Sequence, residues 1–537
     1  MIRPGHQRSD ESITFLGDFS KKLVTNTFFN LLGRSWSFLV TLLLTPYILS
    51  HLDVDDFGIW VILSVLISSF TLLDLGLGSS FVKFISGYYT YEDYDSINKV
   101  LFSGLVFYTL LGAALIGTGL ALEGILFSFL NIQNVSEPFL LVLIACAITN
   151  IGAMFLSVFR GIQRMDRANS LEVRMSTVNV IGTVLFLQMG FGLFGLALNA
   201  VFSSIIGLFL TWYQVRRTLP RISLGFHFDG KILHEMFSYG AKIQVSRLAS
   251  LVCFQMDKLI ISRFLGIGTV SFYEVSSRLA SFMRAVPLVM LSAIIPATAE
   301  LGARNERGMI LKTYLLASKY VAMVTIAMVA FLFIEADSVL QFWLGRGFEQ
   351  SVILVQILAI GYGVNVLGGA ASQTGAGIGR PEFDMRSTIL LSVLNPILSV
   401  LLVRQFGAPG AAAGTCMALV CAAVYLLTTF HRNYVETPIW TLFREIHLRP
   451  LIAGILAGVA VAGFHHMLPG VPQLLQVRYL IPLKMALDFT IFSSVYVVLL
   501  VALRQVTAID WKNFLGLMTF GFEFLRHPFR ERVKIYR

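Results

Sequence analysis

The sequence predicts an all-α polytopic membrane protein with about fourteen transmembrane helices. Of its 537 residues, 56% are hydrophobic and only 13% are charged, a composition that excludes an ordinary water-soluble globular protein. Stretches of about 20 mostly apolar residues, long enough to cross the hydrocarbon layer, recur from Leu23 to Leu503 with short gaps. The connections between them are alternately basic and non-basic, as expected of a chain that crosses a membrane repeatedly.

The expected spans follow one another closely along the chain. The polar residues 1–22 before the first span lack the apolar core and cleavage site of a signal peptide, so we expect the first span to direct insertion. The spans lie at residues 25–49, 58–82, 100–122, 138–159, 174–193, 195–215, 237–262, 271–296, 314–335, 351–372, 386–405, 408–430, 449–468 and 479–503.

Basic side chains gather in every second connection and indicate the orientation. The connections at 51–56 and 131–138 carry no Lys or Arg, whereas the connection at 160–174 carries four Arg. Excess Lys and Arg mark the cytoplasmic side, so the pattern predicts that both termini are cytoplasmic. The formal charge of +10 is explained by this topology, and we expect no nucleic-acid partner.

The sequence shows no pattern that predicts a metal or nucleotide site. Its four cysteines lie inside apolar runs without the spacing of metal ligands or disulfides, which is typical of small core side chains. No nucleotide-binding motif is present, so we expect no cofactor and no ATP hydrolysis. The cysteines are Cys146, Cys253, Cys416 and Cys421.

An internal repeat organises the spans. FGLFGLALNA at 191–200 returns as FGAPGAAAGT at 406–415, and Asn179 aligns with Asn395 at nearly the same displacement. Six spans per copy preserve the membrane orientation, so we expect two bundles related by a pseudo-twofold axis along the membrane normal. The predicted parts are a cytoplasmic N-terminus (1–22), an N-lobe (23–217), a cytoplasmic linker (218–236), a C-lobe (237–432), two extra spans (433–505) and a tail (506–537).

The tail combines an apolar stripe with a basic end. This pattern predicts an interfacial helix that rests on anionic headgroups. The apolar residues at helical spacing are Trp511, Phe514, Leu515, Met518, Phe522 and Leu525, followed by Arg526, Arg530, Arg532, Lys534 and Arg537.

Four predicted spans carry polar stripes, which are costly in lipid unless they face a cavity or a partner. They are the first, second, seventh and eighth spans, which occupy equivalent places in the two copies, so we expect them to line a shared central cavity. The stripes include Asn30, Arg34, Asp74, Lys242, Arg247, Asp257, Glu274, Arg278 and Arg284.

The expected cavity lining has more cations than carboxylates. A cationic cavity favours an anionic substrate, and guanidinium groups match the geometry of phosphate oxygens. The alternative is that Glu274 pairs with Arg278 and Arg34 with Asp74 only to hold helices together. We predict substrate binding by Arg34, Asn30, Lys242, Arg247, Arg278 and Arg284, and gating or H⁺ or Na⁺ coupling by Asp74, Asp257 and Glu274.

Other polar residues in the spans are predicted to be structural. Asn179 and Asn395, each with hydroxyl neighbours on its stripe, favour helix packing, because amides commonly bridge spans. The pair His465 and His466 has no metal-like context and is expected to be interfacial.

Several motifs resemble those of the polysaccharide flippase branch of the multidrug, oligosaccharidyl-lipid and polysaccharide (MOP) exporter superfamily. They are LVTNTFFNLLGRSW at 23–36, PYILSHLDVDDFGIW at 46–60, LLDLGLGSSFVKF at 72–84 and the FGxxGxA repeats. The resemblance covers spans one to twelve. It implies that Arg34 and the basic residues of spans seven and eight bind a diphosphate, and that Asp74 is a gating or pairing group.

The resemblance also implies a function and its partners. Similar proteins carry a polyprenyl-pyrophosphate-linked oligosaccharide, such as an O-antigen repeat unit, from the cytoplasmic to the periplasmic leaflet of the bacterial inner membrane. We expect alternating access and a monomer, with membrane lipids and polysaccharide polymerase or assembly proteins as further partners.

Three alternatives stay open at this point. Lipid II flippases also have two extra spans, which resemble a groove for the lipid tail. A cation-coupled multidrug exporter would prefer organic cations, which the basic cavity disfavours. A polysaccharide ligase or polymerase usually has a sizeable external loop, and the external connections here are short, so we expect no enzymatic activity.

Overall fold

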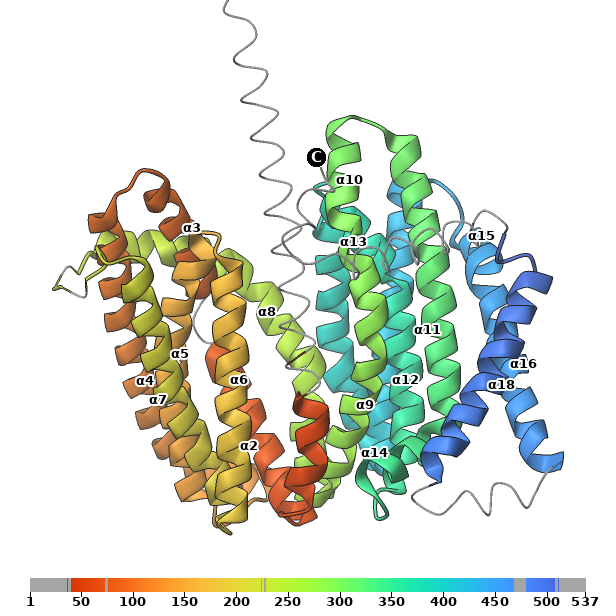
Figure 1. Cartoon of the computed structure of the whole chain (residues 1–537), viewed down its shortest axis with the longest axis horizontal. Helices are drawn as coiled ribbons and strands as arrows, with labels where there is room; N and C mark the ends of the chain where they lie inside the picture. The colour runs from red at the N-terminus through yellow and green to blue at the C-terminus, as the bar shows by residue number, and fades with distance from the viewer. Residues whose placement is uncertain are drawn as a thin grey trace, which may run out of the picture. The chain divides into compact units, whose positions relative to one another are not determined.

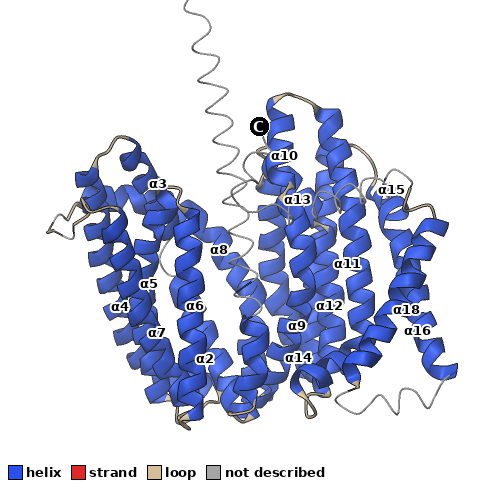
Figure 2. Ribbon diagram, in the orientation of Figure 1, coloured by secondary structure: helices blue, strands red, loops and turns tan. Residues whose placement is uncertain are grey.

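A computed structural model describes Trp36 and residues 40–72, 76–223, 225, 226, 228–467, 480–507 and 510. Within these ranges the side chains of residues 70–72, 241–243, 245–248 and 250 are outside the description. The described residues form helices and connections and contain no strand (Figures 1 and 2). The all-α class predicted from composition is confirmed.

The first seven predicted spans are helical over most of the residues that the structure describes. A short helix, Val40–Leu49, covers the end of the first span. Because Leu72 ends one helix and Leu77 begins the next, the second span is divided between two helices. The helices are α2 (Val54–Leu72), α3 (Leu77–Thr90), α4 (Tyr94–Leu130), α5 (Ser136–Gly161), α6 (Met165–Gln188), α7 (Gly192–Thr218) and α8 (Gly230–Leu265).

The second half of the chain is equally helical. The helices are α9 (Ile267–Ser292), α10 (Ile294–Ala303), α11 (Arg307–Leu344), α12 (Gln350–Leu367), α13 (Gly369–Gly377), α14 (Glu382–Phe430), η1 (His431–Val435), α15 (Ile439–Leu442), η2 (Phe443–His447), α16 (Leu448–Met467) and α18 (Ile481–Ala502).

Ten helical segments of the described chain are long and apolar enough to cross a membrane. One of them contains α14, which holds two predicted spans separated by a break at Gly407, where φ is 63° and ψ is −143°. The first span is described only in part, the second is divided, and α8 is not among the ten. The multi-pass architecture is confirmed, whereas the count of fourteen stays a prediction.

The two copies of the FGxxGxA motif have the same backbone geometry. Gly192 and Gly407 both have positive φ, 53° and 63°, a conformation that glycine adopts without a steric penalty. A Cβ atom on Gly195 or on Gly410 would meet the Cβ of the phenylalanine that opens the motif, at 2.8 Å and 3.0 Å. The motif therefore encodes the same close turn between consecutive helices in each copy.

Contacts divide the chain into two compact units. The first unit is Met1–Phe282 with Met385–Ala422, and the second is Met283–Asp384 with Ala423–Arg537. Leu77, Phe81 and Phe159 belong to the buried core of the first unit, and Tyr314 and Phe430 to that of the second. The predicted division into the lobes 23–217 and 237–432 stays a prediction.

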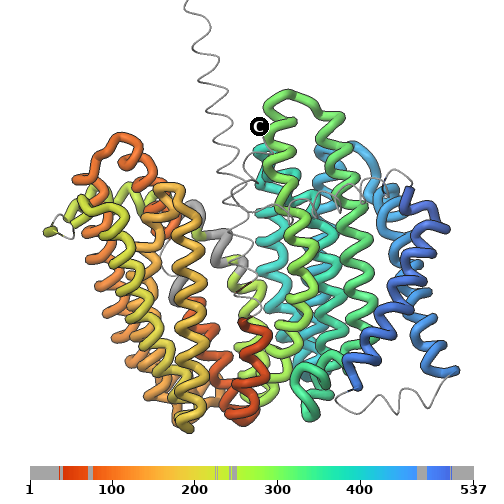
Figure 3. Tube along the Cα trace, in the orientation of Figure 1, coloured from red at the N-terminus to blue at the C-terminus, as the bar shows by residue number. Residues whose placement is uncertain are grey.

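Within the second unit, α16 and α18 pack against each other and against α11 (Figure 3). The two extra helices are thus integral to this unit. Their shared core includes Ala453, Ala457, Phe492 and Tyr496, and the Tyr496 hydroxyl donates a 2.8 Å hydrogen bond to the carbonyl oxygen of Met323 on α11. Small residues such as these alanines let helix backbones approach closely.

Candidate functional site

The carboxylate of Asp257 lies buried in the first unit, surrounded by polar side chains. Tyr273 and Thr415 donate hydrogen bonds of 2.8 Å to Oδ2, and Ser399 donates one of 3.0 Å to Oδ1. Asn395 Nδ2 lies 3.4 Å from Oδ2. We call Asp257, Tyr273, Asn395, Ser399 and Thr415 the Asp257 cage.

No basic side chain pairs with Asp257 among the residues whose side chains are described. Asp257 comes from α8, Tyr273 from α9, and the other three members of the cage from α14. A buried carboxylate surrounded by hydroxyl and amide groups is suited to hold a proton or a small hard cation. The cage therefore supplies the kind of group that ion coupling requires.

The repeat shows which part of this arrangement is unique to the second copy. In the first copy, the Asn199 amide donates 3.0 Å hydrogen bonds to the Thr183 hydroxyl and to the carbonyl oxygen of Asn179. Asn179 and Thr183 precede Asn395 and Ser399 by 216 residues, whereas the motif alignment places Asn199 opposite Gly414, the residue before Thr415. The Asn395 amide bridges α14 and α8 through a 2.9 Å hydrogen bond to the carbonyl oxygen of Cys253, as predicted, whereas Asn179 contributes its backbone carbonyl oxygen. Among the described side chains, a carboxylate is enclosed in the second copy and not in the first.

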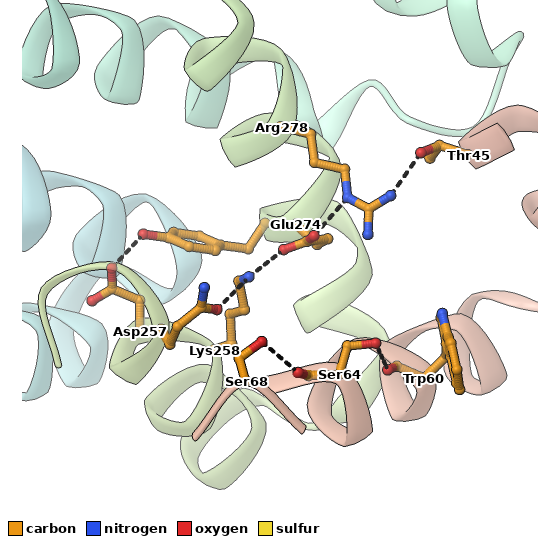
Figure 4. Close-up of polar contacts among 10 residues, drawn as sticks. Thr45, Trp60, Ser64, Ser68, Asp257, Lys258, Glu274 and Arg278 are labelled. Carbon is orange, nitrogen blue, oxygen red and sulfur yellow. Dashed lines mark hydrogen bonds and ion pairs between the residues drawn. The ribbon is translucent and has the colours of Figure 1, made fainter. Parts of the chain in front are cut away.

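A second polar cluster lies next to the cage (Figure 4). Glu274 accepts a 2.6 Å ion pair from Lys258 Nζ and another of 2.6 Å from Arg278 Nε. Arg278 Nη1 also donates a 2.7 Å hydrogen bond to the Thr45 hydroxyl on the helix Val40–Leu49. The i,i+4 pair of Glu274 and Arg278 that the spacing predicts is thus present, and we call Lys258, Glu274 and Arg278 the triad.

The triad carries a net positive charge. Two cations share one carboxylate, and the side chains of Lys258 and Glu274 are only 10% and 8% exposed. The Arg278 side chain is 22% exposed, so its guanidinium is the most accessible charge of the three. The guanidinium carbon of Arg278 also lies 5.7 Å from the ring centre of Phe57, a distance at which the cation and the aromatic ring attract each other.

The cage and the triad are linked through neighbouring residues. Asp257 and Lys258 are consecutive on α8, and Tyr273 and Glu274 are consecutive on α9. Tyr273 bonds to Asp257, and Glu274 pairs with Lys258. A displacement of α8 against α9 that alters one contact must therefore alter the other.

Arg284 is placed in the second unit. Its Nη2 atom donates a 3.4 Å hydrogen bond to Asn365 Oδ1, and its guanidinium carbon lies 5.0 Å from the ring centre of Tyr362. Both partners are on α12. Asn365 is therefore a contact of a predicted substrate-binding arginine.

The remaining predicted site residues lie outside the described part of the chain. The structure does not describe Asn30, Arg34 or Asp74. It describes the backbone of Lys242 and Arg247 in α8 but not their side chains. The apolar and basic tail residues from Trp511 to Arg537 are also outside it. Their roles stay predictions.

Sequence reasoning missed three contributors to these clusters. Tyr273 was overlooked because charged residues follow it in α9. Thr415 was overlooked because it belongs to an alanine-rich repeat. Thr45 is an uncharged residue near the end of the first predicted span. Nothing in the sequence links Asp257 to Thr415, which lies 158 residues away.

The second unit contains an apolar cavity of about 640 Å³ between α11, α12 and α16. Its walls are almost entirely hydrocarbon side chains. They include Ile326, Phe333, Ile360, Leu367, Leu451 and Ile455. A cavity of this kind suits a hydrocarbon chain better than a sugar or a phosphate.

Comparisons with known proteins agree with this architecture. A protein of Shigella flexneri named "Putative O-antigen transporter" is 21% identical over 421 residues, which cover 76% of this chain and 98% of that protein. The solved structure of the lipid II flippase MurJ in an inward closed conformation is similar, with a TM-score of 0.68, 14% identity, and coverage of 89% of this chain and 99% of that one.

A second solved structure, an inward-facing multidrug resistance MATE family transporter of the MOP superfamily, has a TM-score of 0.65 and 19% identity, covering 76% of this chain and 95% of that one. At these identities the two structures support the fold alone. The family model described as "Polysaccharide biosynthesis protein" matches residues 23–302, more than half of the chain. This multi-pass membrane protein therefore belongs to the polysaccharide biosynthesis protein family.

Proposed function

We propose that this protein is a flippase that moves a polyprenyl-pyrophosphate-linked oligosaccharide, the repeat unit of a surface polysaccharide such as O-antigen, from the cytoplasmic to the periplasmic leaflet. The family and the name of the Shigella relative support a role in polysaccharide export. The proposed setting is the bacterial inner membrane, with both termini cytoplasmic and the protein acting as a monomer. Polysaccharide polymerase or assembly proteins are proposed partners.

The triad is the observation that carries the proposal. A diphosphate needs charge-assisted hydrogen bonds to replace its hydration within the membrane, and a net positive cluster with an accessible guanidinium offers them. Lys258 shares Glu274 with Arg278, so Arg278 can exchange part of its pairing for phosphate oxygens without leaving Glu274 uncompensated. Arg284 is a second proposed phosphate ligand.

The Asp257 cage is the proposed site of H⁺ or Na⁺ coupling. A proton on the carboxyl, or Na⁺ held by the carboxylate and hydroxyl oxygens, would cancel its charge and redirect the hydroxyl of Tyr273. Because Tyr273 precedes Glu274, this change reaches the triad. Ion binding can then favour one conformation, and substrate binding the other, as alternating access requires.

The apolar cavity of the second unit is the proposed place for part of the polyprenyl tail. Its lining offers hydrocarbon contacts and almost no polar atoms. The sugars and the diphosphate need a polar route, whereas the tail can remain in an apolar one. The two environments match the two halves of the proposed substrate.

The test is complementation of a strain that needs this protein for its surface polysaccharide. We expect Arg278→Gln to abolish or strongly reduce polymer export while the protein level stays normal. Arg304→Gln is the matched control, because Arg304 forms an exposed pair with Glu300 and should export normally. Normal export by Arg278→Gln would contradict the role of the triad.

A lipid II flippase is the second candidate. The feature that motivates it is the pair of extra helices, α16 and α18, since the resemblance described above implies two extra spans in lipid II flippases as well. Rescue of a strain depleted of its lipid II flippase would support this candidate. Resistance to cationic drugs would instead support the multidrug exporter, which the positive triad disfavours.

A further inference from the structure

Four charged or titratable side chains meet in the second unit, away from the cage and the triad. Lys484 Nζ on α18 lies 2.9 Å from Glu335 Oε2 on α11 and 3.2 Å from Asp488 Oδ2 on its own helix. His465 Nε2 on α16 lies 2.8 Å from Asp488 Oδ1. His465, which the sequence predicts to be interfacial, thus belongs to a network that joins all three helices.

The four side chains of the network differ in how deeply they are buried. The side chains of Asp488 and Glu335 are 0% and 1% exposed, and that of Lys484 is 15% exposed. The His465 side chain is 26% exposed, the most of the four. The imidazole is therefore the most accessible group of the network.

The charge balance depends on the protonation of His465. Two carboxylates and one ammonium leave a net charge of −1 when the imidazole is neutral and zero when it is protonated. An unbalanced charge is costly in a buried membrane site, whereas a balanced network is not. The network with a protonated His465, which has no net charge, is therefore the more stable one.

The contact with Asp488 also indicates where the proton binds. An ionised carboxylate only accepts hydrogen bonds, so Nε2 of His465 must carry a hydrogen even when the ring is neutral. The additional proton is then taken up at Nδ1. Lys484 has a further partner in the Ser338 hydroxyl at 2.8 Å, which holds the ammonium between the helices.

We infer that His465, Asp488, Lys484 and Glu335 form a proton-binding site, and that proton uptake at His465 strengthens the packing of α16 and α18 on α11. The other titratable side chains nearest in sequence on these helices are Asp337 and His466. Both are exposed, and Asp337 accepts a hydrogen bond from Gln341. The inference goes beyond the proposed transport function, and its test needs no transport assay.

The test is thermal unfolding of the full chain in detergent or nanodiscs between about pH 5.5 and about pH 8, the range over which histidine changes charge. Protonated His465 stabilises the folded state, so we expect the apparent Tm to fall by about 2 °C or more as the pH rises. His465→Gln should remove this part of the pH dependence. His466→Gln is the matched control and should keep the wild-type profile.

Asp488→Asn separates this inference from a merely structural network. The variant leaves Glu335 and Lys484 balanced while His465 is neutral, and a protonated His465 would have no carboxylate partner. We therefore expect that the Tm no longer falls as the pH rises, and that the apparent Tm at about pH 8 is at least equal to that of the wild type. Hydrogen exchange of residues 481–502 in His465→Gln provides the same comparison if Asp488→Asn does not fold. Unchanged pH dependence in His465→Gln would overturn the inference, and so would a folded Asp488→Asn variant whose apparent Tm at about pH 8 is lower than that of the wild type.

Discussion

Tyr273 on α9 donates a 2.8 Å hydrogen bond to the buried carboxylate of Asp257 on α8. The next residue in each helix forms a second link, since Lys258 pairs with Glu274 at 2.6 Å. Two neighbouring contacts between α8 and α9 thus belong to two different sites. The Asp257 cage has no basic partner among the described side chains, and the triad has a net positive charge. This pairing is the basis of the first two predictions.

Asp257→Asn should remove ion coupling without loss of stability. The amide keeps the size of the side chain but binds neither a proton nor Na⁺ strongly, and it ends the cost of burying a charge. We expect substrate uptake into vesicles to stop responding to the H⁺ or Na⁺ gradient, each collapsed separately. The matched control is Thr183→Val, which breaks the equivalent hydrogen bond in the first copy, where no carboxylate is enclosed. A lower apparent Tm for Asp257→Asn would show that the carboxylate is structural.

Glu274→Gln should destabilise the protein more than Arg278→Gln does. Removal of the shared carboxylate leaves Lys258 and Arg278 buried without their counter-charge, at a cost of about 3 to 5 kcal/mol. Arg278→Gln leaves Glu274 still paired with Lys258. Thermal unfolding measures the difference, and the double variant Lys258→Gln with Glu274→Gln should recover part of the loss. Equal stabilities of the two single variants would contradict the shared role of Glu274.

Gly58→Ala should disrupt the packing of α2 against α9. A Cβ atom at this position would lie closer to the carbonyl oxygen of Ile267 than van der Waals contact allows, and 3.1 Å from the Ser271 hydroxyl. Both atoms belong to the start of α9, where Ser271 donates a 2.5 Å hydrogen bond to the Val54 carbonyl oxygen. We expect a loss of about 1 to 3 kcal/mol, visible as a lower apparent Tm. Gly302→Ala, at a helical glycine with no neighbour within 4 Å of the added atom, should be neutral or slightly stabilising.

Asp510→Asn should loosen the segment that follows α18. Burial by itself would raise the pKa of the Asp510 carboxyl, but hydrogen bonds from Lys319, Tyr320 and Thr507 outweigh it and lower the pKa. A depressed carboxyl pKa adds stability above the ordinary value of about 4 and loses it as the pH falls through the lowered value. Faster hydrogen exchange of residues 503–507 is expected in the variant at neutral pH, and in the wild type only in strong acid. Glu436→Gln, in an exposed pair with Arg307, should leave this exchange unchanged.

Particular residues show how far prediction from sequence extends. The FGxxGxA motif could be read as a repeated turn because glycine occupies backbone conformations that other residues avoid, and Gly192 and Gly407 do so. The pair of Glu274 and Arg278 could be predicted because it lies within one helix turn. Tyr273 and Thr415 could not be assigned to Asp257, because they reach it across 16 and 158 residues of chain. The contact between His465 and Asp488 could not be predicted for the same reason, since the two residues are on different helices.

The sequence by itself determined the helical multi-pass architecture and the internal repeat. Both follow from local properties, since a lipid bilayer requires long apolar helices, and a repeated segment forms the same turns wherever it occurs. Only the tertiary structure decided which polar side chains share a site, because contacts between helices depend on rotation and register that hydropathy does not encode. It separated a carboxylate enclosed by hydroxyl and amide groups from a positive triad one residue away, and it placed a titratable network where the sequence indicated only two extra spans.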